Sequence, residues 1–253
     1  MIDDKERTSR VTPTARVLGF WASVAAASTF VGYTICFAAI LSTSPVFAWT
    51  SLADYLAYDA IYGGPFRTAA QVLMIVFALS FVVLANAIQD CAQRERKTLA
   101  RIGADFGLLF ALAVSIHYFA QVSAVRISVR EGLTAGLEHF VQANPYSILS
   151  AVNMLGWGVF LGLASLFLAP AFPGSGVERV IRWAFLANSI FCLGGGLGYL
   201  LELEWLIFVT TTLGMGAAVL TATVALALWF RRHQASHDDG PLHSDARKEE
   251  TSW

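Results

Sequence analysis

The sequence predicts an all-α, polytopic bundle of six membrane-spanning helices, and three observations indicate it. The 253-residue chain is 56% hydrophobic and only 14% charged. A soluble domain carries about 25% charged residues, so charge cannot cover this surface in the usual way. Six apolar runs each approach or exceed the roughly 20 residues that cross the hydrocarbon of a bilayer. Each run is expected to be helical, because lipid offers no hydrogen-bond partner to an open backbone amide.

The six expected spans are separated by segments that carry turn-forming or charged residues. They cover residues 17–41, 68–88, 99–125, 149–169, 180–201 and 205–230. The first run exceeds the roughly 7–15 residues of a signal-peptide core, which favours a span over a cleaved leader. The sixth run is rich in Val, Thr and Ala, yet a helix is expected because the bilayer overrides a modest β-propensity.

Basic residues set the expected orientation, because loops rich in Lys and Arg stay on the cytoplasmic side. Of the 17 Lys and Arg residues, 14 lie in the two tails and at the connections after the second and fourth spans. The remaining three are Arg67, Arg126 and Arg130. We therefore expect both termini in the cytoplasm. The expected parts are a tail over 1–16, a six-span bundle over 17–231 and a disordered tail over 232–253.

Polar residues inside the spans mark the part of the bundle where function is expected. His117 and Gln121 are four residues apart on the third span and therefore share a helix face. The histidine is expected to be neutral, because an ionised group near mid-bilayer costs about 2.5–3.5 kcal/mol. One interpretation is an outward-facing polar pocket under the outer loops, lined by His117, Tyr118, Gln121, Gln71 and Asn153. The alternative is a hydrogen-bond network that only joins helices, at about 0.6 kcal/mol per bond.

Both long outer loops carry signals of a short helix at the level of the lipid headgroups. In the first, Ser51 and Asp54 form a capping pair, and Gly63-Gly64-Pro65 ends the helix. In the second, helical spacing relates Leu133, Leu137, Phe140 and Val141. We expect both segments to anchor at the interface or to cover the bundle as a lid.

Several kinds of chemistry lack the residues that they need. Bis-histidine haem and membrane zinc sites need several ligands at membrane depth, whereas His117 is the only histidine inside the spans. The three cysteines lie far apart and suggest neither a disulfide framework nor a zinc site. Asp105, the sole candidate for a buried carboxylate, is expected to pair with Arg101 one turn away. We expect no metal, no cofactor and, at a net charge of −1, no nucleic-acid partner.

Three stretches in the middle of the chain share a pattern with a known group of proteins. They read HYFAQVSAVR from His117, GLEHFVQANPYS from Gly136 and LGWGVFLGLASLFLAPAF from Leu155. The matching positions are Tyr118, Phe119, Gln121, Phe140, Gln142, Asn144, Pro145 and 166–170. They resemble a family of uncharacterised bacterial inner-membrane proteins with about six spans. The resemblance covers about the third and fourth spans. It implies a multi-pass protein of the bacterial cytoplasmic membrane and brings no particular activity.

Two functions of different classes remain. The first is binding or transport of a small neutral or lipid-like molecule through the outward-facing pocket. The alternative is a structural or regulatory membrane protein that acts through partner contacts and has no substrate. An enzyme ranks below both, because the spans carry no catalytic constellation. Small-residue spacings such as Gly158-x-x-x-Gly162 and Gly194-x-x-x-Gly198 indicate close helix packing and leave homo-oligomerisation open.

Overall fold

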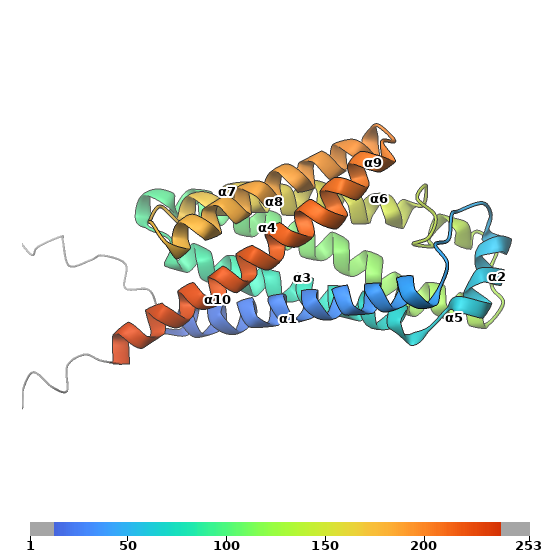
Figure 1. The fold of residues 1–253 in the computed structure, drawn as a ribbon, viewed down its shortest axis with the longest axis horizontal. Coiled ribbons are helices and arrows are strands. Elements are labelled where there is room, and N and C mark those ends of the chain that lie inside the picture. Colours follow the sequence, from blue (N-terminus) through green and yellow to red (C-terminus); the bar gives the residue numbers. More distant parts are fainter. Residues whose placement is uncertain (1–12, 239–253) are drawn as a thin grey trace, which may run out of the picture.

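The fold is all α-helical across residues 13–238, the part of the chain that the computed structural model describes (Figure 1). Most of both expected tails, at 1–12 and 239–253, lies outside the described residues. Six helical segments are long and apolar enough to cross a membrane, which confirms the predicted fold class. Their bounds are close to the expected ones: Pro13–Thr43, Pro65–Cys91, Arg94–Arg130, Ile148–Ala171, Val177–Leu200 and Glu204–His233.

Three spans are continuous α-helices and three contain a π-helical segment. The continuous helices are α1 (Pro13–Thr43), α3 (Pro65–Cys91) and α8 (Val177–Leu200). The third span, after the turn η2 (Arg94–Arg96), joins α4 (Lys97–Ala120), the π-helix η3 (Gln121–Val125) and α5 (Arg126–Arg130). The fourth joins α6 (Ile148–Met154), the π-helix η5 (Leu155–Phe160), α7 (Leu161–Leu168) and the turn η6 (Ala169–Ala171). The sixth joins α9 (Glu204–Ile207), the π-helix η7 (Phe208–Met215) and α10 (Gly216–Asp238).

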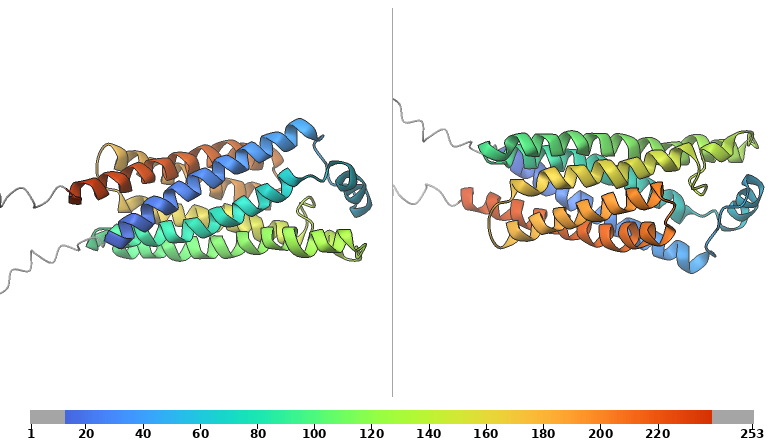
Figure 2. Two further views of the ribbon diagram at one scale, coloured as in Figure 1. Left: turned by 90° about the horizontal axis from the view of Figure 1, so that it is seen from below. Right: turned by 90° about the horizontal axis from the view of Figure 1, so that it is seen from above.

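The six spans form a closed ring in which each packs against two neighbours. In ring order, the contacting helices are α1, α3, α4, α7, α8 and α10, and α10 returns to α1. Both ends of the described chain lie at one end of the bundle, here called the terminal end (Figure 1, Figure 2). The opposite loop end carries α2 (Leu52–Tyr62) and the 131–147 connection with its single turn η4 (Leu137–His139).

Aromatic side chains fill the middle of the ring. Phe77 of α3 stacks on Trp157 of η5 with ring centroids 5.8 Å apart. Phe110 of α4 meets the same indole edge-on at 4.9 Å, and both phenylalanines are fully buried. Lipid is as apolar as these side chains, so their contact stabilises the bundle through dispersion and shape complementarity rather than through dehydration.

Two glycines allow helix backbones to approach closely. A Cβ atom at Gly158 in η5 would lie 2.7 Å from the Cα of Gly196 in α8. A Cβ atom at Gly103 in α4 would lie 3.0 Å from the backbone nitrogen of Leu168 in α7. The predicted packing role of the spacing at Gly158 is therefore confirmed within this chain.

The three π-helical segments all lie in the part of their spans nearer the loop end. A π-helix is rare and often marks a functional site, because its wider i→i+5 ladder redirects side chains. In η7 the hydroxyls of Thr210 and Thr211 donate to the carbonyls of Leu206 and Ile207 at 2.6 and 2.7 Å. These bonds help to satisfy the altered backbone, and irregular backbone at membrane depth is tolerated where protein or a cavity covers it.

The outer segments follow the sequence prediction at one loop and contradict it at the other. Helix α2 forms as expected, and the Ser51 hydroxyl accepts a hydrogen bond from the Asp54 backbone N–H at 3.1 Å. The predicted helix in 131–147 is wrong, because only one turn forms there. Gly132 and Gly136 adopt left-handed φ angles of +71° and +74°, which interrupt a helix.

Candidate functional site

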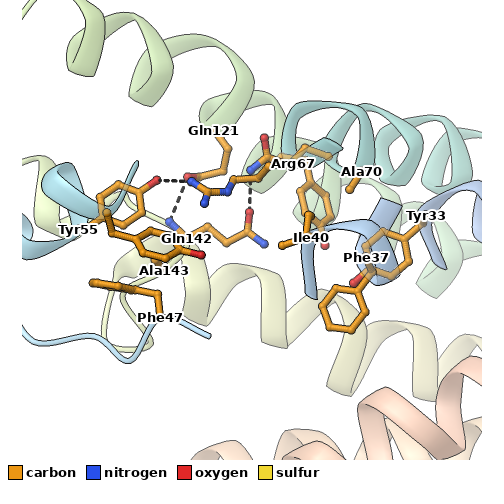
Figure 3. Close-up of a pocket in the computed structure, with 13 residues that line it drawn as sticks. Tyr33, Phe37, Ile40, Phe47, Tyr55, Arg67, Ala70, Gln121, Gln142 and Ala143 are labelled. Atoms are coloured by element: carbon orange, nitrogen blue, oxygen red, sulfur yellow. Dashed lines mark hydrogen bonds between the residues drawn. The ribbon is translucent and has the colours of Figure 1, made fainter. Parts of the chain in front are cut away.

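Three cavities meet at the loop end of the ring. The first, here called the loop cavity, has a volume of about 280 Å³ and is walled by α1, α2, α3, the third span and the 131–147 connection (Figure 3). Its lining residues are Tyr33, Phe37, Ile40, Phe47, Tyr55, Tyr58, Arg67, Ala70, Gln71, Tyr118, Gln121, Gln142 and Ala143. Aromatic walls with a few converging polar groups are typical of ligand pockets.

Helix α2 and the 131–147 connection cover this cavity together. Tyr55 of α2 packs in one apolar cluster with Val125 of η3 and with Leu137 and Val141 of the connection. The hydroxyl of Tyr58 donates to the Pro45 carbonyl at 2.9 Å, which ties α2 to the segment that precedes it. The arrangement fits the lid that the sequence predicted.

Gln121 holds the connection through both ends of its side-chain amide. Its Nε2 donates to the Phe140 carbonyl at 2.7 Å, and its Oε1 accepts from the Gln142 backbone N–H at 3.0 Å. A backbone carbonyl only accepts and a backbone N–H only donates, so these partners fix which amide atom is which. Gln121 therefore borders the cavity and also anchors its cover.

Gln71 and Gln142 form a second polar link across the cavity. The Nε2 of Gln71 donates to the Oε1 of Gln142 at 2.9 Å. Each side-chain amide has two donors and one acceptor oxygen, so this single bond leaves further hydrogen-bonding capacity on both side chains. The pair therefore offers polar groups to a ligand at the loop end of the bundle.

Arg67 is the only charged side chain among the described residues that line the loop cavity. It forms an ion pair with Asp59, and its Nη1 also lies 3.4 Å from the Tyr55 hydroxyl that accepts its hydrogen bond. Both contacts use Nη1, so the donors on Nε and Nη2 remain for another partner. Burial raises the pKa of Tyr55 and nearby Asp59 raises it further, so this hydroxyl is neutral at physiological pH.

A rim cavity of about 240 Å³ adjoins the loop cavity at the outer edge of the bundle. The two share Tyr55, Arg67, Gln71 and Gln121. The rim cavity adds further charged groups, Asp59 and Arg126, to the same polar region. Two guanidinium groups and one carboxylate therefore surround the joined space.

A side crevice of about 450 Å³ runs from the loop cavity toward the middle of the bundle, between α1 and the sixth span. Tyr33, Phe37 and Tyr118 line both spaces and join them. Asn153 lines the crevice, and its Oδ1 is buried without a hydrogen-bond partner in the described chain. The rest of the lining is mainly aromatic and aliphatic, with three threonines, Thr34, Thr211 and Thr212.

His117 lies outside the lining of all three cavities. It is 1% exposed, and its Nδ1 lies 2.8 Å from the carbonyl oxygen of Leu149 at the start of the fourth span. Because a carbonyl only accepts, Nδ1 carries the proton, which leaves Nε2 as the acceptor of a neutral imidazole. Nε2 is buried and has no hydrogen-bond partner within the described residues.

The structure brings together three of the five predicted site residues, Gln71, Tyr118 and Gln121. Asn153 lines the adjoining crevice, whereas His117 joins two spans instead. Arg67 was not predicted as a site residue from the sequence. It is one of only three Lys or Arg residues in the connections expected at this end of the bundle, and that scarcity could have identified it. The expected pairing of Arg101 with Asp105 is wrong, since no ion pair joins them in the described chain.

Within residues 13–233, no three His, Cys, Asp or Glu side chains group closely enough to hold a metal ion. Comparisons with protein-family models, with curated proteins and with solved structures find no match to this chain.

Proposed function

We propose that this protein binds a small neutral or lipid-like molecule in the joined cavities at the loop end, within a bacterial cytoplasmic membrane. The junction of the loop cavity with the side crevice carries the proposal. Buried polar side chains, Gln71 at 8% and Gln121 at 5% exposure, line the loop cavity beside that junction, among aromatic walls. Polar groups at membrane depth that border a cavity commonly mark binding or transport pathways, and the volumes approach or fall within the roughly 300–1,000 Å³ of ligand sites.

Retention of a ligand tests the proposal directly. Full-length protein purified in a mild detergent is expected to carry a molecule of defined mass in native mass spectrometry. Gln71→Leu is expected to lose it, because the change removes a polar group from the cavity wall. Asn86→Leu is the matched control, since Asn86 lies on the same helix, is exposed and bonds only to its own helix at Val82. A wild-type protein that retains no molecule under any extraction condition contradicts the proposal.

In the proposed orientation both termini face the cytoplasm and the cavities open toward the outside. Support comes from the basic residues, which are concentrated at the terminal end and in the connections beside it. In a cysteine-free background, Ala53→Cys in α2 and Gln93→Cys after α3 test it, because both positions are exposed. An impermeant maleimide added to intact cells is expected to label only position 53. Labelling of position 93 alone reverses the orientation.

A structural or regulatory role is the second candidate. It is favoured by His117 and Gln121, whose hydrogen bonds run to backbone groups of neighbouring segments rather than into a cavity. Under this alternative the wild-type protein carries no ligand, and Gln71→Leu behaves as wild type in every purification. Chemical cross-linking in membranes is then expected to recover one reproducible partner or a second copy of the chain.

A further inference from the structure

We infer that the ligand is a membrane lipid with an anionic phosphate headgroup, which enters from the bilayer between α1 and the sixth span. Its headgroup lies at Arg67 and Arg126, and its hydrocarbon chain lies in the side crevice. This inference rests on the proposed function and deepens it, because it names the ligand class and the route of entry for the same cavities.

The charges around the loop and rim cavities select an anion. Arg67 and Arg126 supply two positive charges against the single carboxylate of Asp59. Arg126 donates from Nε to the Val122 carbonyl at 2.8 Å, and its two terminal nitrogens form no hydrogen bond or ion pair with the described residues. Two guanidinium groups that line one cavity and keep unused donors match the charge and the hydrogen-bond acceptors of a phosphate. One excess positive charge suits the single negative charge of a phosphodiester.

The side crevice has the composition of a site for a hydrocarbon chain. Phe30, Met74, Trp157 and Met215 line its apolar wall. Methionine adapts to irregular apolar shapes, so such a wall accepts a flexible chain better than one rigid ring. The crevice adjoins the loop cavity through shared aromatic residues, and the loop cavity in turn adjoins the rim cavity. From the rim cavity to the side crevice, the site presents guanidinium groups, then the side-chain amides of the glutamines, then an apolar wall. The groups of a lipid follow the same order, from a charged headgroup to a hydrocarbon chain.

The crevice opens sideways into the surface that faces the membrane. Helices α1 and α10 lie close together at the terminal end and diverge toward the loop end (Figure 1). The crevice lies in this divergence, and its lining residues Thr34, Thr212 and Ala217 are exposed on the outer surface of the ring. A lipid can therefore enter from its own leaflet without passing through water.

Headgroup selection tests the charge argument. The full chain is reconstituted in phosphatidylcholine nanodiscs that contain a minor fraction of phosphatidylglycerol, then re-extracted for native mass spectrometry. Wild type is expected to retain phosphatidylglycerol above its share of the bilayer. Arg67→Gln is expected to reduce that retention at least about tenfold, as the loss of a charge-assisted bond implies. Asp59→Asn breaks the same ion pair but removes the negative charge, so its retention is expected to equal or exceed wild type.

Blocking the crevice tests the entry route. Thr212→Trp places a large ring in the crevice wall, whereas Leu213→Trp places the same ring one residue away on an exposed surface outside it. Thr212→Trp is expected to abolish lipid retention and Leu213→Trp to leave it unchanged, with equal thermal stability of the two variants in detergent.

The outcomes separate this inference from the function on which it rests. Retention of a water-soluble molecule in place of lipid overturns the lipid assignment and leaves ligand binding intact. Retention of phospholipid without headgroup preference, or equal loss with Arg67→Gln and Asp59→Asn, overturns the anionic headgroup. Equal retention by Thr212→Trp and Leu213→Trp overturns the lateral route. Retention of nothing by wild type overturns both proposals.

Discussion

Two buried side-chain amides, one in each half of the bundle, differ in what they hold. Asn188 of α8, nearer the terminal end, donates to the Ser165 hydroxyl of α7 at 2.7 Å and joins two neighbouring spans. Gln121, near the loop end, binds backbone groups of the 131–147 connection through both of its amide atoms. The first amide strengthens a contact between helices, whereas the second holds a cover over a cavity.

Packing follows the same division. From the terminal end to the aromatic centre, the spans touch through Gly103 and through fully buried rings such as Phe110, and a groove of about 560 Å³ between α8 and the sixth span is open at the surface. Toward the loop end the helices contain π segments, and three cavities separate them. A packed base that supports an open upper half gives binding groups a rigid foundation while it leaves room for a ligand.

The largest expected effect compares a phenyl side chain packed in the aromatic core with one that lines a cavity. Phe110→Ala removes a fully buried phenyl that contacts Trp157, Phe81 and Phe77, and is expected to lower the free energy of unfolding by about 3 kcal/mol. Phe37→Ala removes a ring that lines a cavity and is 37% exposed, and is expected to cost less than about 1 kcal/mol. Steric-trap or denaturant unfolding in bicelles measures both. Equal losses contradict the division.

The next effect compares two glycines. At Gly103 an alanine methyl would lie 3.0 Å from the Leu168 nitrogen and 3.1 Å from the Ala164 carbonyl oxygen, so Gly103→Ala is expected to destabilise by about 1–3 kcal/mol. At Gly216 the nearest atom would be 3.6 Å away on the Phe30 ring, an ordinary contact. Gly216→Ala is therefore expected to change stability by about 0.5 kcal/mol or less. Thermal unfolding in one detergent ranks the two variants, and the reverse order contradicts the packing argument.

The sequence predicted the regular parts of this molecule because their signals are local. Apolar length located the six spans, and the Ser51 cap located α2. The apolar spacing in 131–147 predicted a helix that does not form, since two glycines there adopt left-handed φ angles. Local patterns therefore succeed wherever the backbone stays within one regular conformation.

Only part of the site could be predicted from the sequence, because the rest depends on tertiary contacts between segments. The α-helical spacing grouped His117 with Gln121, and the Gln121 backbone N–H does bond to the His117 carbonyl, but the His117 ring bonds to the Leu149 carbonyl and does not line the cavity. Arg67 reaches the cavity beside Asp59 because the Gly63-Gly64 turn brings α2 back onto α3, a tertiary relation that no local pattern encodes. Gln71 and Tyr118 were found because buried polar groups at membrane depth are rare.

A smaller effect contrasts the two amides. Gln121→Leu leaves the Phe140 carbonyl and the Gln142 N–H without their partner, and is expected to cost about 1–2 kcal/mol. Asn188→Leu removes one bond between side chains and is expected to cost about 0.6 kcal/mol. Hydrogen exchange is expected to accelerate in residues 137–144 with Gln121→Leu alone. Unchanged exchange there would falsify the role of Gln121 as an anchor of the cover.

The smallest expected effect concerns Asp54 on α2, because its side chain is exposed. The hydroxyls of Thr50 and Ser51 each donate to its Oδ2 at 2.7 Å, and these bonds lower the pKa of Asp54 below its ordinary value of 3.8, Ser51 more than Thr50. The folded carboxyl thus binds its proton more weakly than the unfolded one. The linked stabilisation of α2 is therefore fully present above pH 3.8 and is lost as the pH falls through the lower folded pKa.

Replacing each hydroxyl in turn shows which of the two lowers the pKa of Asp54 more. Ser51→Ala is expected to raise the pKa of Asp54 more than Thr50→Val does, because Ser51 lowers it more strongly. Carbon-13 NMR titration of the Asp54 carboxyl in detergent-solubilised protein measures both shifts, and Asp54→Asn assigns the signal. An unchanged pKa in Ser51→Ala contradicts the hydrogen bond from the Ser51 hydroxyl to the Asp54 carboxylate. A larger pKa shift in Thr50→Val than in Ser51→Ala would mean that Thr50, the residue before the N-cap, makes the stronger hydrogen bond to Asp54 and contributes more to holding the start of α2.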